Sequence, residues 1–114
     1  MSERITEAEF QRQAEQAIAE LERAFGKLAE QHDIDVQVEG GVLSVSFEEG
    51  DPGKFIVSPN SPVRQLWVSA RVSSFKFNWS EETGQFVLTG TGETLTRVMT
   101  RLTREQLEDE DVSL

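Results

Sequence analysis

Two carboxylates, Asp33 and Asp35, are the residues whose types and spacing best suit chemistry in this chain. They stand two apart in a segment where Ile34, Val36 and Val38 alternate with polar residues, which predicts a β-strand. Alternate residues of a strand point to the same side, so the two carboxylates would share one face. Clustered carboxylate oxygens suit hard cations such as ferric iron, and ferrous iron less selectively. A solvated polar face would show the same pattern, so both interpretations stay open.

The other residues that could carry chemistry form no catalytic motif. His32, the single histidine, stands beside Asp33 and could add one ligand, but we interpret it as a loop residue. Without cysteine or a second histidine, the sequence offers no ligand set for tight transition-metal binding. It has no G-x-S-x-G nucleophile motif and no phosphate-binding loop with the required lysine. We therefore expect no enzyme, and iron oxidation on the carboxylates is the one credible activity.

Trp67 is the residue best placed to bind a protein partner. In the run from 63 to 71, side chains alternate between two faces, and Leu66, Val68 and Ala70 form the apolar one. Trp67 falls on the opposite, polar face, where a large exposed aromatic is typical of a docking point. A loop that covers this face would instead give the tryptophan a packing role.

A long amphipathic helix should precede these strands. Thr6 and Glu9 form a capping box, and the apolar residues that follow at spacings of three and four predict a helix as far as Leu28. The apolar stripe of this helix is Phe10, Ala14, Ala17, Ile18, Leu21, Phe25 and Leu28. A second helix is expected to begin near Thr91 or Gly92. Its buried face is Leu95, Val98, Met99 and Leu102.

Between the helices the apolar pattern changes to a period of two. Gly40 and Gly41 supply a two-residue hairpin turn between strands near 33–39 and 43–48. Further strands are expected at 55–57, 63–71, 75–79 and 85–89, with a turn at 58–62. This order predicts an α+β fold in one domain, 1–114: a two-layer α-β sandwich whose antiparallel sheet carries both helices on one face.

Charge is distributed unevenly along the chain, whose net charge is −10. Residues 1–50 hold 12 acidic and 4 basic side chains, whereas residues 51–107 hold 5 acidic and 7 basic ones. The acidic half should repel nucleic acid and anionic membranes, and attract cations or a basic protein. We expect a cytoplasmic protein, because no cysteine, signal peptide or transmembrane run is seen.

The second helix and the residues after it carry opposite charges. Arg97, Arg101 and Arg104 lie together on one helix face, which we interpret as solvated and where Glu93, Glu105 or the acidic segment 108–111 could pair with them. Val112 and Leu114 follow as possible apolar anchors.

Three stretches of the chain, taken in order, resemble the frataxin family. They are VEGGVLSVSF at 38–47, QLWVS at 65–69 and GETL at 92–95. The resemblance extends over nearly the whole chain and implies an α-β sandwich, the architecture that periodicity predicts. It implies an iron-binding regulator or iron chaperone of iron–sulfur cluster assembly, monomeric without iron, that binds the cysteine desulfurase and its scaffold protein. The alternative is an acidic protein-interaction module with no physiological metal.

The resemblance also implies which residues carry the function. Iron would bind weakly along an acidic ridge on the first helix and first strand, formed by Glu22, Glu30, Asp33, Asp35 and Glu39. Protein partners would contact the sheet at Asn60, Arg64, Gln65 and Trp67. The ridge is thinned, since bacterial members of the family tend to carry acidic or polar residues where this chain has Arg23, Gly26, Lys27, Ala29 and Gln31.

Overall fold

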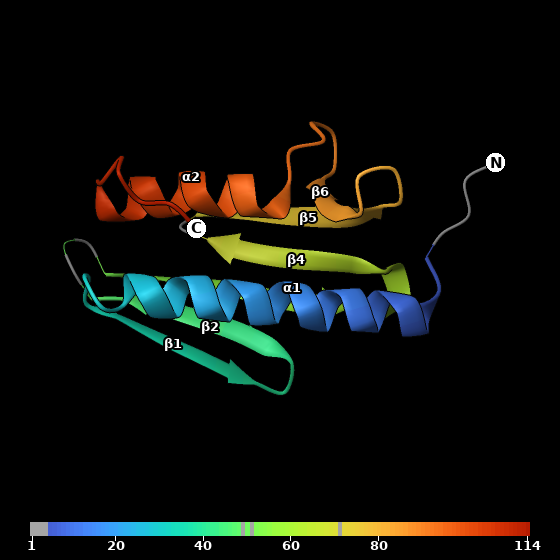
Figure 1. The fold of residues 1–114 in the computed structure, drawn as a ribbon, viewed down its shortest axis with the longest axis horizontal. Helices are drawn as coiled ribbons and strands as arrows, with labels where there is room; N and C mark the ends of the chain where they lie inside the picture. Colours follow the sequence, from blue (N-terminus) through green and yellow to red (C-terminus); the bar gives the residue numbers. More distant parts are fainter. Residues whose placement is uncertain (1–4, 49, 51, 71) are drawn as a thin grey trace.

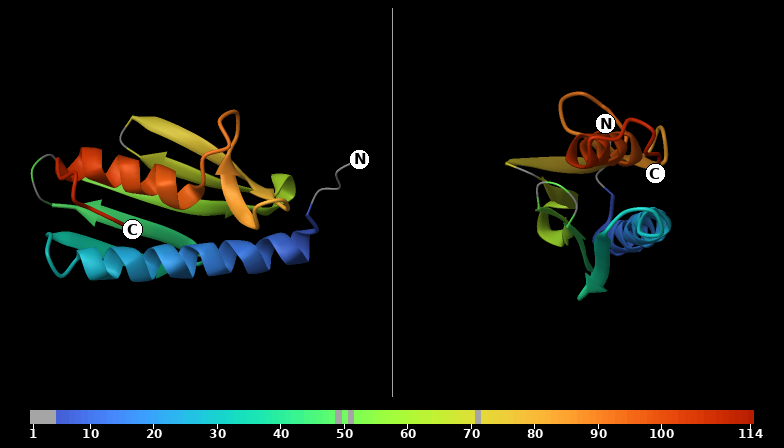
Figure 2. Two further views of the ribbon diagram at one scale, coloured as in Figure 1. Left: turned by 45° about the horizontal axis from the view of Figure 1, so that its top comes forward. Right: turned by 90° about the vertical axis from the view of Figure 1, so that its left-hand side faces the viewer.

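The computed structural model describes residues 5–48, 50, 52–70 and 72–114, and within them two helices lie on one face of a six-stranded antiparallel sheet (Figures 1 and 2). The predicted α-β sandwich is thereby confirmed. The helices are α1 (Glu7–Leu28) and α2 (Leu95–Leu107). The strands pair in chain order and are β1 (Ile34–Glu39), β2 (Val42–Phe47), β3 (Gly53–Asn60), β4 (Gln65–Ala70), β5 (Ser73–Ser80) and β6 (Gln85–Leu88).

The first helix begins where its capping residue predicts. The Thr6 hydroxyl accepts a hydrogen bond from the Glu9 amide at 3.2 Å, which satisfies one of the free N–H groups of the first turn. At its two ends α1 packs on distant strands: the Phe10 ring meets Phe86 of β6 and the Phe25 ring meets Phe47 of β2. The helix therefore crosses the sheet diagonally, from β6 to β2.

The β1–β2 hairpin follows its predicted turn. Gly40 and Gly41 have φ values of +60° and +80°, a left-handed conformation that glycine adopts without steric cost. The turn pairs Glu39 with Val42, and this register directs alternate residues of β2 into the core. The buried residues on the inner face of the sheet are Leu43, Val45, Phe47, Phe55, Val57, Leu66, Val68, Ala70, Phe77 and Phe86.

The prediction that the third strand ends at Val57 was wrong, because β3 continues to Asn60. Proline is disfavoured in a central strand because it has no backbone N–H to donate to a neighbouring strand. Beyond Val57, however, β3 has no partner in β2 and pairs with β4 alone, with Pro59 opposite Leu66. The end of β3 is thus an edge, where proline is tolerated.

The boundaries of other elements also differ from the predictions. The predicted strand 63–71 is shorter, since 61–63 form a 3-10 helix, η1 (Ser61–Val63), and Arg64 follows with φ +51°. Arg71 lies outside the described residues. The second helix begins later than Thr91 or Gly92, because the Thr94 hydroxyl caps it by accepting the Arg97 amide at 3.3 Å.

After α2 the chain folds back between the two helices (Figure 1). Glu108 turns it with φ +51°, and Val112 is then buried with 4% of its surface exposed. The Arg104 Nε donates to the Val112 carbonyl at 2.8 Å. The predicted anchoring is therefore confirmed: Val112 is buried, and Leu114 packs against the core with part of its surface exposed. No helix in the described part of the chain is long and apolar enough to cross a membrane.

We expect Val112→Ala to lower the free energy of unfolding by about 1–2 kcal/mol, the effect of losing two buried methyl groups. Val72→Ala is the matched control, because Val72 is fully exposed in the turn between β4 and β5. Urea unfolding followed by circular dichroism gives both values. Equal stability of the two variants would mean that the C-terminal segment does not hold the helices together.

Candidate functional site

Trp67 stands on the outer face of the sheet, the face away from both helices, with 38% of its surface exposed. Its neighbours Leu66 and Val68 are buried on the inner face. The exposure predicted from strand alternation is therefore confirmed. An aromatic of this size left in water offers a large apolar contact area to a partner protein.

A chain of side-chain hydrogen bonds runs from Trp67 across the outer face. The Trp67 indole N–H donates to Gln65 Oε1 at 3.0 Å, and Gln65 Nε2 donates to Asn78 Oδ1 at 3.2 Å. Asn78 Nδ2 donates to Thr89 Oγ1 at 2.6 Å, and this hydroxyl donates to the Lys76 carbonyl at 3.0 Å. The chain ties β4 to β5 and to the residue after β6, so these side chains hold one another in place.

Lys76 holds Trp67 from a second direction. The two residues are opposite one another in the β4–β5 register, and the Lys76 Nζ lies 5.1 Å from the centre of the indole ring. This is a cation–π contact. A side chain whose rotamer is already fixed loses little conformational entropy when it binds. We call Gln65, Trp67, Lys76, Asn78 and Thr89 the Trp67 surface.

Three members of the Trp67 surface were missed by the sequence reasoning: Lys76, Asn78 and Thr89. A signal for two of them exists, because alternation with Phe75, Phe77 and Trp79 puts Lys76 and Asn78 on the polar side of their strand. Their position beside Trp67 depends on the pairing of β4 with β5.

The other two predicted partner residues lie at the edge of this surface. Asn60 is opposite Gln65 in the β3–β4 register, and its side chain is half-buried. Arg64 turns back on its own loop, and its Nη1 donates to the Pro62 carbonyl at 3.1 Å. Its guanidinium therefore supports the 3-10 turn between the two strands.

The predicted ridge residues are exposed, and they follow one edge of the molecule. Asp35 and Glu39 belong to β1, the edge strand of the sheet, and Asp33 precedes it. Glu30 lies in the turn after α1, and Glu22 lies on the helix near the far end of β1. Asp35 Oδ2 accepts a hydrogen bond from Gln37 Nε2 at 3.0 Å.

These carboxylates are spread out. Among the described residues, no group of three or more histidine or acidic side chains is placed to hold a metal ion. Side chains on one face of a strand repeat about every 7 Å, so Asp35 and Glu39, which are two repeats apart, are separated by about 13 Å along β1. Any cation on this edge would have few protein ligands and would keep much of its water. Charges on an edge strand also discourage pairing with another chain.

His32 lies in the loop before β1, as expected, and it faces the C-terminal segment. Its Nε2 lies 3.4 Å from Asp109 Oδ2, and the side chain is mostly buried. Arg23 and Lys27 of α1 line the same cavity of about 640 Å³, together with Asp109 and Asp111. Two basic residues of the thinned ridge thus lie beside the acidic C-terminal segment.

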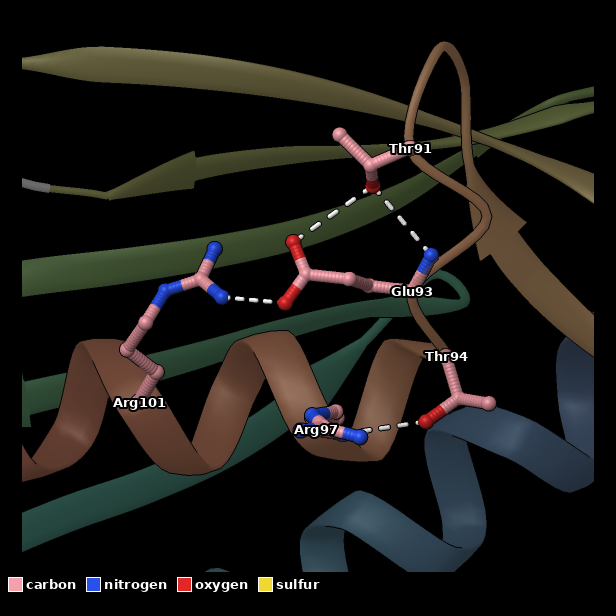
Figure 3. Close-up of polar contacts among 5 residues, drawn as sticks. All are labelled: Thr91, Glu93, Thr94, Arg97 and Arg101. Atoms are coloured by element: carbon pink, nitrogen blue, oxygen red, sulfur yellow. Dashed lines mark hydrogen bonds and ion pairs between the residues drawn. The ribbon is translucent and has the colours of Figure 1, made fainter.

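Of the arginines on α2, Arg101 has the acidic partner that the sequence suggested (Figure 3). Arg101 forms an ion pair with Glu93, whose amide donates to Thr91 Oγ1 at 3.2 Å. The hydrogen bond from Arg101 lowers the pKa of the Glu93 carboxyl below its ordinary value. Arg104 binds the C-terminal segment through the Val112 carbonyl. These contacts link α2 to the residues on either side of it.

Most of the chain matches known proteins of one family. Residues 3–109 match the family described as the frataxin-like domain. The "iron-sulfur cluster assembly protein CyaY" of Azotobacter vinelandii is 36% identical over 108 residues, 93% of each chain. The protein of the same name from Ralstonia nicotianae is 33% identical over 106 residues, 91% of this chain and 90% of its own. A solved frataxin from Psychromonas ingrahamii has the same fold, with a TM-score of 0.79 and 18% identity over 92% of this chain and 94% of its own.

We expect Glu93→Gln to be destabilising at neutral pH and progressively less so in acid. A carboxyl whose pKa is lowered in the folded state adds stability above its ordinary pKa of 4.5 and loses it as pH falls through the folded value. The difference in urea midpoint between wild type and variant should therefore shrink below about pH 4.5. Glu105→Gln, in α2, is the control. A difference that does not change with pH would contradict the assignment.

Proposed function

The chain belongs to the frataxin-like family, and on that premise we propose that it acts in iron–sulfur cluster assembly as an iron-binding regulator or iron chaperone. The observation that carries the proposal is the Trp67 surface, an exposed aromatic fixed by hydrogen bonds and a lysine. A prearranged surface of this kind supports a protein that works by docking on other proteins. The matched relatives, named as assembly proteins and covered over nine tenths of their length, point to the same process.

The proposed partner is the cysteine desulfurase together with its scaffold protein. Trp67 would supply the apolar anchor of the contact, and the polar side chains around it would exchange hydrogen bonds with the partner. The acidic residues of α1 and β1 would guide a basic partner surface toward this edge. Recognition would therefore combine a short-range aromatic contact with long-range attraction.

The proposed cargo is iron, held weakly on the acidic edge. Asp33 and Asp35 are its principal ligands in this proposal, with Glu22, Glu30 and Glu39 nearby along the ridge. Exposed carboxylates compete with water for the ion, so the affinity should be in the micromolar range or weaker. Weak binding suits a protein that must release its ion to another.

The second candidate is an acidic interaction module that has no physiological metal. The spacing of the carboxylates favours it, because the described residues form no ready-made group of three metal ligands. In this case the acidic edge would serve only to attract a basic partner, and Trp67 would anchor it as before.

Trp67→Ala should weaken binding to the desulfurase–scaffold complex by about 2 kcal/mol and leave folding stability almost unchanged, because the ring is exposed. Trp79→Ala is the control. Trp79 packs against Phe86 at 5.1 Å between ring centres, so its loss should cost stability by about 2–3 kcal/mol. Urea unfolding and calorimetric titration measure the two effects. Unchanged affinity of Trp67→Ala would remove the sheet face from the docking surface.

The double change Asp33→Asn and Asp35→Asn should abolish most ferrous iron binding in anaerobic calorimetry. The matched control is Glu81→Gln with Glu82→Gln, an exposed acidic pair in the turn between β5 and β6. The control should bind iron as the wild type does. Equal iron binding by both variants would place the site elsewhere, and a wild type without measurable binding would leave the interaction module as the function.

A further inference from the structure

A groove of about 310 Å³ opens between α1 and the tip of the β1–β2 hairpin. It exists because α1 crosses the sheet diagonally. The N-terminal half of the helix leans toward β6, where Phe10 meets Phe86, and the hairpin tip is left uncovered on the other side (Figure 1). Ala14, Ile18 and Ala19 line the groove on the helix side. Val38 and Pro59 line the groove on the sheet side.

Val38 is the apolar residue that this geometry leaves in water. Ile34, Val36 and Val38 share the inner face of β1 by alternation. Ile34 and Val36 are half-buried and pack against the core, whereas Val38 keeps 39% of its surface exposed. A valine that points to the core side and has no cover is suited to receive another apolar side chain.

The charges around the groove have one sign. Among the described residues that line it, the charged ones are Glu15 and Glu22. They are seven positions apart on α1, two turns along the same helix face, with Ala19 between them. An occupant would therefore gain from an aliphatic side chain at the centre and positive charges on both sides of it.

The groove also lies at the same end of the molecule as the Trp67 surface. Pro59 and Ser61 line the groove, and Asn60, between them in the chain, pairs with Gln65 in the β3–β4 register. The groove opens on the inner face of the sheet and Trp67 stands on the outer face, with the 3-10 turn of 61–63 between them. A single partner bound at this end of the sheet could contact both the groove and the Trp67 surface.

We propose that the groove receives a basic segment of the same protein partner that docks on Trp67, with an aliphatic side chain of that segment placed on Val38 between Glu15 and Glu22. This inference rests on the proposed function, because the partner is the same. It adds a contact of different chemistry on the opposite face of the sheet, so that the partner would hold the end of the sheet from two sides.

The first test measures the affinity of the protein for the desulfurase–scaffold complex. Val38→Ser should weaken binding about fivefold, the effect of losing roughly 1 kcal/mol of apolar contact. Val72→Ser is the matched control, since this fully exposed valine lies in the β4–β5 turn at the other end of the sheet. Circular dichroism melts of both variants establish that they fold. If Trp67→Ala weakens the complex and Val38→Ser does not, this inference fails and the proposed function stands.

The second test needs no complex. The probe is a synthetic six-residue peptide with two central leucines and two basic residues on either side, titrated into the ¹⁵N-labelled protein. Amide shift changes at Glu15, Ala19, Glu22, Val38 and Gly41 are expected with this peptide. They support the proposal if they vanish with two control peptides, one in which alanine replaces the leucines and one in which glutamate replaces the basic residues. Shifts that persist with either control peptide, or no shifts at all, would overturn it. Shifts at these residues that grow with protein concentration alone would assign the groove to a second copy of the chain.

Discussion

The apolar layer between the sheet and the two helices is the constraint on which the rest of the structure depends. Its side chains come from alternate strand residues, so each buried position determines the direction of its neighbours. Leu66 and Val68 enter this layer from β4, and Trp67 must then face the opposite side. A shift of one residue in the pairing of β4 would bury Trp67 and expose the core. The position of the Trp67 surface is thus a consequence of core packing.

The same layer also produces the groove. Phe10 and Phe25 attach the ends of α1 to β6 and β2, so the helix cannot lie parallel to the β1–β2 hairpin along its whole length. The hairpin tip is left without a cover, and Val38 stays exposed there. An unfilled position of this kind costs apolar burial, and a partner that fills it would recover that burial on binding.

The arrangement of charge separates two uses of the acidic residues. The carboxylates of β1 lie on an open edge, where they protect the strand and remain available to a cation or a basic partner. Asp109 and Asp111 of the C-terminal segment instead lie beside His32, Arg23 and Lys27 in the cavity between α1 and that segment. Arg23 and Lys27, the basic residues of the thinned ridge, therefore lie beside a segment of opposite charge, and this segment folds back between the two helices (Figure 1).

Local periodicity was enough to determine much of this protein. The stripe of α1, its Thr6 cap, the Gly40–Gly41 turn and the exposed side of Trp67 all follow from spacings of two to four residues, because each depends on backbone geometry within one element. The tertiary structure decided what depends on pairing between elements. The extension of β3 through Pro59 depends on its pairing with β4. The hydrogen-bond chain from Trp67 to Thr89 and the contact of His32 with Asp109 join residues that are distant in sequence. Strand register and helix crossing bring them together, and no local spacing encodes either one.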